Sequence, residues 1–366
     1  MSAIFVCAGE LSGDRYVAPV VRELRRRLSD WRFWGVGSAC LAKQQVALVC
    51  RAEQLAATGT LDAARRGPAF VQALLRLKRA IAADPPRLAL LVDAPTLNMR
   101  LIGWLRASGV PIVYFLAPQR WAWRPSATAA LRAVDRLAVA LPFEQSWFAR
   151  HGVATTFVGH PLVDRRVPTN IQPRVGKAPL IAIFPGSRDN ETRRHLPLFC
   201  AALAELQRTT DARGVVGIAS AAHGQLCRQL APQLEQCEAW RLMHQADLGL
   251  AASGSVTLET ALAGLPTVVC YRTSPLTAWL GQRLVGVPWL SLPNLLLGRP
   301  LLPEFVQQQA TPVALARALR TLGHAEVASA VRLQLLKVRP LLGEPGVAGR
   351  VAQLALERLG LDKAAD

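Results

Sequence analysis

The sequence predicts an α/β protein made of two doubly wound, Rossmann-like domains. Short apolar runs alternate with helical patterns along both halves of the chain, which is typical of a parallel sheet with crossover helices. The alternation stops at a proline-bearing segment near the middle and then starts again. A length of 366 residues suits roughly two domains, and a hydrophobic fraction of 51% is enough for two cores.

The first half of the chain contains the elements of the first predicted domain. The expected strands are Ala3–Ala8, Arg32–Val36, Leu88–Val92, Pro111–Phe115, Arg136–Ala140 and Thr156–Val158. The helical patterns between them include Tyr16–Leu28, Ala69–Ala83 and Asn98–Ala107, and Ser108-Gly109 supplies a stop signal for the last of these.

The best candidate for a linker is Val163–Ala178, which contains Pro168 and Pro173 and has no periodicity. The strands expected after it are Leu180–Phe184, Gly214–Ala219, Leu248–Ala251 and Thr267–Tyr271. We therefore expect an N-terminal domain over residues 1–165, a linker over 166–178, and a C-terminal domain with a helical tail over 179–366. Two such domains would face a central cleft, with ligands bound beyond the carboxyl ends of the strands.

The composition restricts the class of protein. Seven cysteines are scattered without a C-x-x-C pair, which indicates reduced thiols and favours neither a zinc site nor a disulfide framework. No apolar run approaches the roughly 20 residues of a membrane-spanning helix, and Asp14 and Arg15 interrupt the N-terminal apolar run, so we expect no secretory signal. The net charge of +18 favours anionic partners, which include phosphorylated substrates, anionic lipid and nucleic acid.

The most informative loop is Pro185-Gly186-Ser187-Arg188, which follows an apolar run and precedes a helical pattern. A strand, a glycine turn and a helix start in this order direct backbone N–H groups and the positive end of the helix dipole at one point. An arginine in the turn adds a full positive charge. The sequence therefore predicts a phosphate-binding loop at the start of the second domain.

A second loop of the same kind is Ser253-Gly254-Ser255, with Glu259 about one turn into the following helix. A serine N-cap with a glutamate that completes a capping box would explain this loop alone. Two such loops in one domain instead favour a nucleotide diphosphate, with Glu259 accepting hydrogen bonds from ribose hydroxyls. The chain has no D-x-D pair, so we expect no metal, and Arg188 with the helix N-termini would neutralise a leaving group.

Two loops of the first domain carry carboxylates beyond predicted strands. The loop of Glu10, Ser12, Gly13 and Asp14 is either a tight turn with a helix N-cap or a loop that contacts substrate. Asp93 follows the run Leu88–Val92, where it could either cap a helix or accept a proton from an attacking hydroxyl.

Aromatic and basic residues gather further along the first domain. The stretch from Gln119 to Arg124 contains Trp121, Trp123 and two arginines, which could hold a sugar, a lipid phosphate or a nucleobase. His160 lies beyond the last predicted strand of this domain, where a lone histidine is more often structural than catalytic.

Taken together, these loops resemble the lipid-A-disaccharide synthase family of inverting glycosyltransferases. The matching stretches are AGELSGD (8–14), VDAPTLN (92–98), APQRWAWR (117–124), LPFE (141–144), VGHPLVD (158–164), FPGSRDNETRRHLP (184–197), ASGSVTLETALAGLPTVVCYR (252–272) and SLPNLLLGRPLLPEFVQ (291–307). They occur in order and cover most of the chain.

The resemblance implies a GT-B fold of two Rossmann-like domains, with no metal and no cofactor. It implies transfer of 2,3-diacylglucosamine from UDP to 2,3-diacylglucosamine 1-phosphate, which forms the β-1,6 disaccharide of lipid A. Asp93 and Arg188 match the residues that the family needs for activity. The residues that we assign to UDP binding are Gly186, Ser187, Arg188, Ser253, Gly254, Ser255, Glu259 and Asn294. The residues that we assign to the acceptor side are Glu10, Ser12, Gly13, Asp14, Trp121, Arg124 and His160.

The resemblance also implies a cytoplasmic enzyme held at the inner face of the bacterial inner membrane, and a homodimer with exchanged C-terminal segments. The helix pattern Ala69–Ala83 combines an apolar stripe with basic residues, which fits either a core helix or a helix at a lipid surface. No nucleic-acid-binding module is recognisable.

The chain departs from the family pattern at Arg15, Thr96, Leu97 and residues 56–64. These departures concern the acceptor and membrane side. A related UDP-sugar transferase with another acceptor is therefore an alternative, and a basic membrane- or nucleic-acid-binding protein with a decayed site is a third hypothesis.

Overall fold

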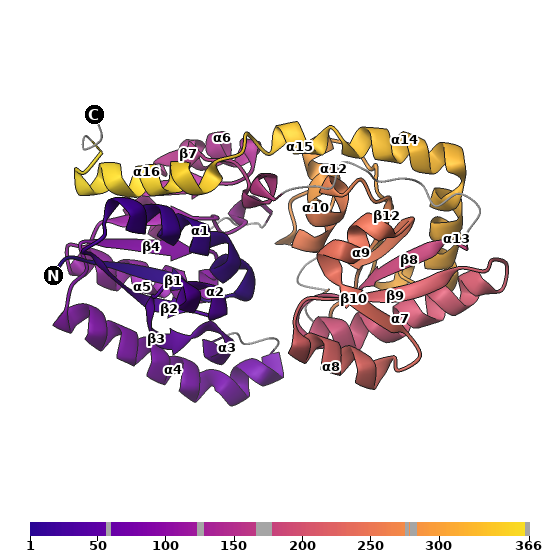
Figure 1. Ribbon diagram of the computed structural model, residues 1–366, viewed down its shortest axis with the longest axis horizontal. Helices are drawn as coiled ribbons and strands as arrows, with labels where there is room; N and C mark the ends of the chain where they lie inside the picture. The colour runs from indigo at the N-terminus through magenta and orange to yellow at the C-terminus, as the bar shows by residue number, and fades with distance from the viewer. Residues whose placement is uncertain (56–59, 123–127, 166–177, 275–277, 279–283, 363–366) are drawn as a thin grey trace. The chain divides into compact units, whose positions relative to one another are not determined.

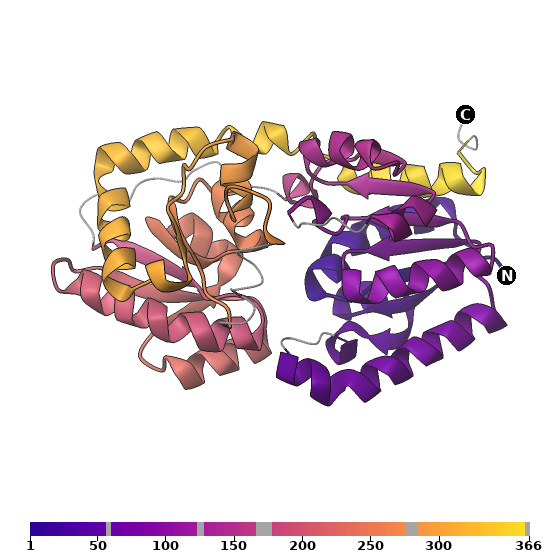
Figure 2. The same cartoon turned by 180° about the vertical axis from the view of Figure 1, so that it is seen from behind.

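The computed structural model describes residues 1–55, 60–122, 128–165, 178–274, 278 and 284–362, and the side chains of residues 53, 54 and 60–66 lie outside the description. The chain forms two compact units, residues 1–165 with 342–366 and residues 166–341 (Figures 1 and 2). Each unit contains one parallel sheet with helices on both faces. The α/β class with two doubly wound sheets is therefore confirmed.

The first unit has a sheet of seven strands in the order β3-β2-β1-β4-β5-β6-β7. Its strands are β1 Ala3–Ala8, β2 Arg32–Gly37, β3 Ala47–Arg51, β4 Leu88–Val92, β5 Ile112–Phe115, β6 Arg136–Val139 and β7 Thr155–Phe157. Its helices are α1 Leu11–Arg27, α2 Ala39–Lys43, α3 Ala52–Leu55, α4 Thr60–Ala83, α5 Pro95–Ala107, α6 Pro142–Arg150 and α16 Val347–Leu359, with 3₁₀ turns Arg120–Ala122, Ala129–Ala133 and Pro161–Asp164.

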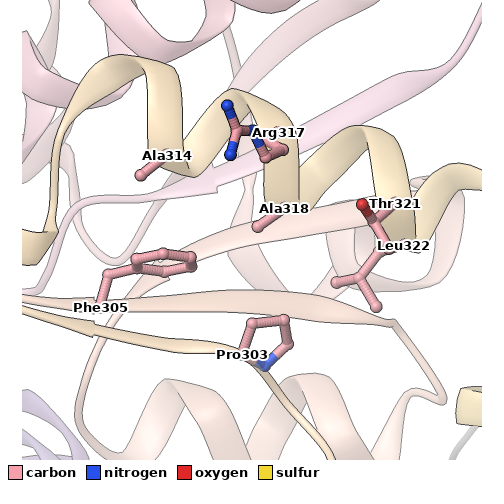
Figure 3. Close-up of a pocket in the computed structure, with 7 residues that line it drawn as sticks. All are labelled: Pro303, Phe305, Ala314, Arg317, Ala318, Thr321 and Leu322. Atoms are coloured by element: carbon pink, nitrogen blue, oxygen red, sulfur yellow. The ribbon is translucent and has the colours of Figure 1, made fainter.

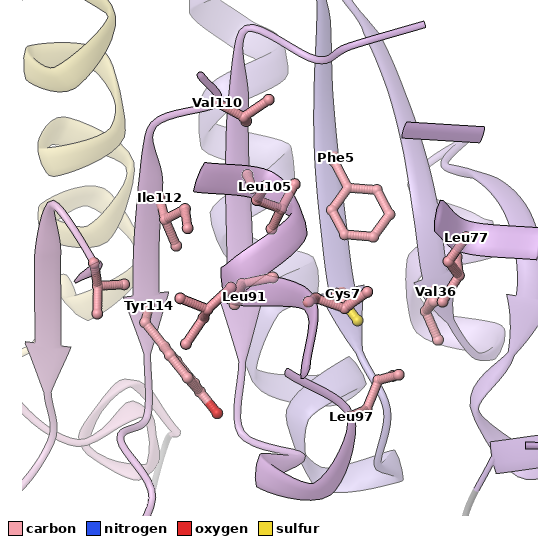
Figure 4. Close-up of a cluster of buried hydrophobic side chains, with 14 of the residues drawn as sticks. Phe5, Cys7, Val36, Leu77, Leu91, Leu97, Leu105, Val110, Ile112 and Tyr114 are labelled. Carbon is pink, nitrogen blue, oxygen red and sulfur yellow. The ribbon is translucent and has the colours of Figure 1, made fainter. Parts of the chain in front are cut away.

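One core cluster of the first unit lies between the sheet and helices α4, α5 and α6. Alternate residues of the central strands, such as Phe5, Leu91 and Tyr114, point into it, and Leu77 and Leu105 meet them from the helices (Figure 4). The same alternation sends the other strand residues to the opposite face, because successive side chains of a strand point to opposite sides. Helices α1 and α16 pack against each other on that opposite face (Figure 1).

The second unit has a sheet of six strands in the order β10-β9-β8-β11-β12-β13. Its strands are β8 Leu180–Phe184, β9 Arg213–Ile218, β10 Glu235–Glu238, β11 Leu248–Ala252, β12 Thr267–Tyr271 and β13 Glu304–Val306. Its helices are α7 Asp189–Gln207, α8 Ala221–Leu230, α9 Ala239–Gln245, α10 Ser255–Leu262, α12 Leu292–Leu297, α13 Pro312–Gly323, α14 Ala325–Leu335 and α15 Val338–Leu341, with a 3₁₀ turn Gln307–Gln309.

The expected strands are all present within one or two residues of their predicted bounds, but three observed strands were not predicted. These are β3, β10 and β13, and each is the outermost strand of its sheet. An edge strand has one neighbour, so its side chains are less buried and its apolar signal is weaker. The burial pattern of β10, which has no fully buried residue, illustrates this.

The division of the chain differs from the expected domain bounds at the C-terminus. Residues 342–366 belong to the first unit, whereas we had assigned them to the second domain. The buried residues Val347, Val351, Ala352, Ala355 and Leu356 form one stripe of α16 that packs on the first unit. Beside them, the Arg350 Nε donates to the Val158 carbonyl at 2.9 Å. Residues 166–177 of the expected linker lie outside the described residues.

Candidate active site

Each sheet has one topological switch point, where successive connections leave the sheet in opposite directions. It lies between β1 and β4 in the first unit and between β8 and β11 in the second. Doubly wound sheets bind ligands in the crevice at this point, beyond the carboxyl ends of the strands. The predicted loops with Asp93 and Arg188 begin where β4 and β8 end, so both belong to switch points.

The switch point of the second unit brings the two predicted phosphate loops together. Strands β8 and β11 pair in parallel with Phe184 opposite Ala251, so their loops leave the same edge of the sheet side by side. Helix α7 begins after its N-cap residue Arg188, and α10 begins after its N-cap residue Gly254. Two helix N-termini therefore direct unpaired N–H groups to one edge. The N-cap of α10 is Gly254 rather than a serine, so the capping-box explanation of this loop is wrong.

Gly186 is required by the geometry of the first loop. Its φ is +112°, and a Cβ placed there would lie 2.6 Å from the Cβ of Glu191. The Glu191 carboxylate pairs with the Arg188 guanidinium at 3.5 Å, and the Arg188 side chain is 51% exposed. The loop therefore presents an accessible guanidinium beside exposed backbone.

Two buried histidines support the Arg188 loop through hydrogen bonds. The Nδ1 of His195 donates to the Pro185 carbonyl at 3.1 Å, and its Nε2 accepts from the Arg272 N–H at 3.0 Å. An imidazole that donates with one nitrogen and accepts with the other is neutral. Burial lowers the pKa of His195, which agrees with this tautomer.

The second histidine acts through a threonine. The Nδ1 of His223 accepts from the Ala219 N–H, so its Nε2 carries the proton and donates to the Thr192 hydroxyl at 3.2 Å. Thr192 donates in turn to the Arg188 carbonyl at 3.1 Å. Among the described residues, no group of His, Cys, Asp and Glu side chains could hold a metal ion.

Asn294 does not fit the UDP-binding role that we assigned to it. Its side chain is fully buried. The Nδ2 donates to the Leu302 carbonyl and to the Glu304 carboxylate, both at 2.8 Å, and the Oδ1 accepts from the Leu302 N–H. All its polar atoms are used inside the protein, so its role is to hold the segment between α12 and β13. Ser253 likewise uses its hydroxyl internally, donating to the Leu290 carbonyl at 3.2 Å.

The switch point of the first unit holds Asp93 in an unusual backbone conformation. Asp93 and Ala94 both have positive φ, at +47° and +43°, which costs energy in residues other than glycine. The Oδ2 of Asp93 accepts from the Ser12 hydroxyl at 3.3 Å. The N-cap residue of α5 is Ala94 and that of α1 is Glu10. Neither Asp93 nor Ser12 is therefore a helix N-cap, which was the purely structural interpretation of these two loops.

Buried polar groups hold this strained turn. The Asn98 Nδ2 lies 2.8 Å from the Asp93 carbonyl and 3.0 Å from the Val92 carbonyl, and the Tyr114 hydroxyl donates to the same Asp93 carbonyl at 2.6 Å. The loop after β1 approaches closely, since a Cβ on Gly13 would lie 3.5 Å from the Cβ of Asp93.

Asp14 and His160 are both buried, so the structure gives them internal contacts in place of the acceptor contacts that we predicted. Asp14 is 2% exposed, and its carboxylate accepts from the backbone N–H groups of Ser38, Cys40 and Leu41, which caps α2. His160 accepts from the Leu162 N–H, and burial lowers its pKa to about 3. It is therefore neutral at ordinary pH.

The predicted aromatic loop is described in part. Trp121 lies in the 3₁₀ turn after β5, and its Nε1 donates to the Glu144 carboxylate at 2.9 Å. Glu144 also accepts from the Ala140 and Leu141 N–H groups. Burial raises the pKa of Glu144 to about 7, against the opposing effect of these three donors. Arg124 lies outside the described residues.

A separate apolar cavity lies between β13 and α13 and has a volume of about 330 Å³ (Figure 3). Pro303 and Phe305 line one side of it, and α13 supplies the other. None of the loops at the switch point contributes to its lining, so the cavity is not part of the candidate active site.

Comparison with known proteins decides the family. The sequence model of a family described as lipid-A-disaccharide synthetase matches residues 4–335. The lipid-A-disaccharide synthase of Myxococcus xanthus is 37% identical over 97% of both chains, and that of Solibacter usitatus is 36% identical over 98% of both. The chain belongs to the lipid-A-disaccharide synthase family.

Solved structures agree with the fold of this family. A co-structure of S. aureus MnaA with UDP superposes with a TM-score of 0.69 at 14% identity, and it covers 99% of this chain and 98% of its own. The calicheamicin glycosyltransferase CalG4 gives a TM-score of 0.59 at 18% identity and covers 100% and 99%. These likenesses confirm the GT-B type of fold for this lipid-A-disaccharide synthase family member.

Sequence reasoning missed the residues that support the site. His195, His223, Thr192, Asn98 and Tyr114 hold the two loops through hydrogen bonds to backbone. The only signal for His195 was its place two turns after Arg188 in a helical pattern. The partners of His223 and Tyr114 are 31 and 21 residues away, so spacing alone did not indicate them.

Proposed function

We propose that this chain transfers 2,3-diacylglucosamine from UDP to 2,3-diacylglucosamine 1-phosphate and forms the β-1,6 disaccharide of lipid A. Membership of the lipid-A-disaccharide synthase family over nearly the full length carries this proposal. The chemistry of the two switch points supports it, because one offers a carboxylate and the other an arginine with two helix N-termini.

The proposed donor site consists of the loops after β8 and β11. The N–H groups of Gly186, Ser187 and Ser255 and the Arg188 guanidinium bind the diphosphate, and Glu259 binds the ribose. Small residues allow this contact, since the space beside Gly254 is open. The S. aureus MnaA co-structure contains UDP together with a chain of the same fold, which fits a uridine diphosphate in this unit.

The proposed reaction is a single inverting displacement. The acceptor hydroxyl oxygen forms a bond to C1 of the donor sugar while the bond from C1 to the β-phosphate oxygen breaks. The hydroxyl proton passes to the Asp93 carboxylate, which Ser12 orients. The electron pair of the broken bond leaves on UDP, where Arg188 and the helix N-termini stabilise the developing charge.

The test is to incubate the purified protein with UDP-diacylglucosamine and the diacylglucosamine 1-phosphate acceptor, and to measure both UDP and disaccharide. We expect the two products in equal amounts. Release of UDP with transfer only to other acceptors would support a related transferase, for which the exposed Arg15 and Thr96 near the acceptor side are the motivating departures. Absence of UDP binding would contradict both enzyme hypotheses.

We also propose that α4 places the enzyme on an anionic membrane surface. None of the helices that the structure describes could cross a membrane. Val71 and Leu75 lie one turn apart on α4 and are 52% and 46% exposed, with the exposed Arg76 and Arg79 beside them. Replacement of both apolar residues with glutamate should reduce sedimentation with vesicles that contain anionic lipid. Unchanged sedimentation would contradict this proposal.

A homodimer is the last part of the proposal. Leu333 on α14 and Leu336 just after it are 63% and 65% exposed, which fits an apolar contact with a second copy. Light scattering after size exclusion should give a dimer for the native chain and a monomer for a variant with charged residues at both positions. A native monomer would contradict it.

A further inference from the structure

We infer that Arg272 is a second guanidinium that binds the donor diphosphate, and that His195 aligns it with the Arg188 loop. This inference rests on the proposed function, because it adds a binding residue to the same UDP site. It extends the site from the carboxyl ends of β8 and β11 to that of β12.

The first observation is the position of Arg272 at the edge of the sheet. Strand β12 ends at Tyr271 and pairs with β11, with Cys270 opposite Ala252. The Ser253 N–H donates to the Cys270 carbonyl at 2.8 Å. Arg272 therefore leaves the sheet beside the Ser253 loop, at the edge where both phosphate loops begin.

The second observation is the shared contact with His195. One imidazole ring contacts the Pro185 carbonyl with Nδ1 and the Arg272 N–H with Nε2. The start of the Arg188 loop and the backbone of Arg272 are thus separated by the width of a single ring. His195 is 1% exposed and stacks on Phe199, so the ring is held rigidly and sets the distance between the two segments.

The third observation concerns charge. Arg188 already pairs with Glu191. The Arg272 side chain is exposed and forms no ion pair with any residue that the structure describes. Burial is the largest influence on two neighbouring groups, and it lowers the pKa of His195 and raises the pKa of the Cys270 thiol. The positive charge of Arg272 acts on both groups in the direction of a lower pKa, which shows that it lies close to them.

A guanidinium carried by a segment that leaves the sheet beside two helix N-termini is suited to a polyanion. A diphosphate has oxygens on both phosphorus atoms, and a guanidinium can bind two oxygens at once. The charge that develops on the leaving UDP is spread over these oxygens, so a second cation would stabilise the transition state as well as the bound donor.

The test compares Arg272→Gln with the native full-length chain by calorimetric titration with UDP and with uridine. A lost charge-assisted contact of about 1.5–3 kcal/mol corresponds to UDP binding at least about 10-fold weaker. Uridine binding should not change, because uridine has no phosphate. Arg213→Gln is the matched control, because it removes one arginine from the first residue of β9, at the opposite edge of the same sheet.

The outcomes separate this inference from the proposed function. If the native chain binds no UDP, the proposed function fails. If the native chain binds UDP and Arg272→Gln binds it equally well, Arg272 is not a diphosphate ligand and this inference is overturned. An equal loss for UDP and uridine would also overturn it, because it would indicate a structural effect. The UDP affinity of Arg272→Lys should lie between those of the native chain and Arg272→Gln, since lysine keeps the charge and loses the bidentate geometry.

Two variants of His195 test the alignment. An asparagine amide can replace the Nδ1 donor to Pro185 but is too short to reach Arg272, whereas a glutamine can place an acceptor near the Arg272 N–H. We expect His195→Asn to weaken UDP binding more than His195→Gln, with similar melting temperatures. His244→Asn is the control, because the Nδ1 of His244 also bonds to a backbone carbonyl, that of Trp240. His244 lies at the C-terminal end of α9, outside the proposed UDP site. Equal UDP affinities for all three variants would contradict the role of His195.

Discussion

The two switch points occupy the same place in their sheets and carry opposite chemistry. In the first unit, the loop after β4 presents the Asp93 carboxylate on a strained turn that buried side chains hold. In the second unit, the loop after β8 presents backbone N–H groups and Arg188 at the start of a long helix. The first arrangement suits the proposed role of Asp93 as a single proton acceptor, and the second suits the proposed binding of an anion.

The difference shows what each task requires from the backbone. The proposed role of Asp93 as a base requires a carboxylate fixed at one point and in one direction, and Asn98 and Tyr114 hold the turn that contains the two positive φ angles. The proposed phosphate site requires close approach of the main chain, and glycine at positions 186 and 254 allows that approach. Each prediction below tests one side of this comparison.

The largest effect is expected for Asp93→Asn in the first unit. Loss of the proposed base should lower kcat by about 10²–10⁴, while UDP binds as in the native chain because the second unit is unchanged. Steady-state kinetics and a UDP titration measure the two quantities. Asp30→Asn, in an exposed turn of the same unit, is the control. A variant with native kcat would exclude Asp93 as the base.

A slightly smaller effect is expected for Arg188→Ala in the second unit. Loss of one preorganised donor to the leaving group should lower kcat by about 10²–10³. The side chain is half exposed, so the melting temperature should remain that of the native chain. Arg193→Ala changes another exposed arginine of α7 and should leave turnover unaltered. Near-native turnover of Arg188→Ala would refute its assigned role.

The strained turn is tested by Asn98→Ala. The variant removes the buried side-chain donor to the Val92 carbonyl and one of the two side-chain donors to the Asp93 carbonyl, which should lower the free energy of unfolding by about 1–3 kcal/mol. The turnover should fall as well, since Asp93 is then less well oriented. Denaturant unfolding measures the first effect. Tyr114→Phe removes only the other donor to the Asp93 carbonyl and should lower the free energy of unfolding by less. A native free energy of unfolding for Asn98→Ala would contradict this account of the turn.

The last test concerns a dependence of stability on pH at Glu144. Burial raises the pKa of Glu144 from 4.5 to about 7, so the folded protein binds a proton that the unfolded chain has lost. The stability that this carboxyl contributes is therefore complete below pH 4.5 and declines as the pH rises to about 7. The difference in melting temperature between the native chain and Glu144→Gln should shift across this range. A difference that stays constant with pH would contradict the raised pKa.

The sequence predicted the centre of each sheet better than its edges. Strands such as Ala3–Ala8 and Leu180–Phe184 are buried on both faces, so they read as continuous apolar runs with clear ends. The edge strands β3, β10 and β13 are partly exposed and lack that signal. The C-terminal residues 342–366 were also assigned to the wrong domain. An amphipathic stripe on α16 predicts that the helix is buried on one side, but it does not identify the surface that the helix covers.

For the site, the sequence by itself determined the residues that carry charge and the loops that carry glycine. Asp93, Gly186 and Arg188 could be recognised because each stands directly after an apolar run and belongs to a motif. Only the tertiary structure decided which neighbours are committed to internal contacts. Asp14 and Asn294 look like ligand residues in the sequence, yet all their side-chain oxygens are used by nearby backbone N–H groups or by buried partners.

The tertiary structure also decided which residues support the site. His195 gains its role only because α7 and the end of β12, 77 residues apart, meet at one imidazole. Hydrogen bonds between distant segments depend on how strands are ordered in a sheet, and that order follows from packing rather than from local pattern. The charges of this protein can therefore be identified in its sequence, whereas their positions relative to the backbone groups that hold them are a property of the fold.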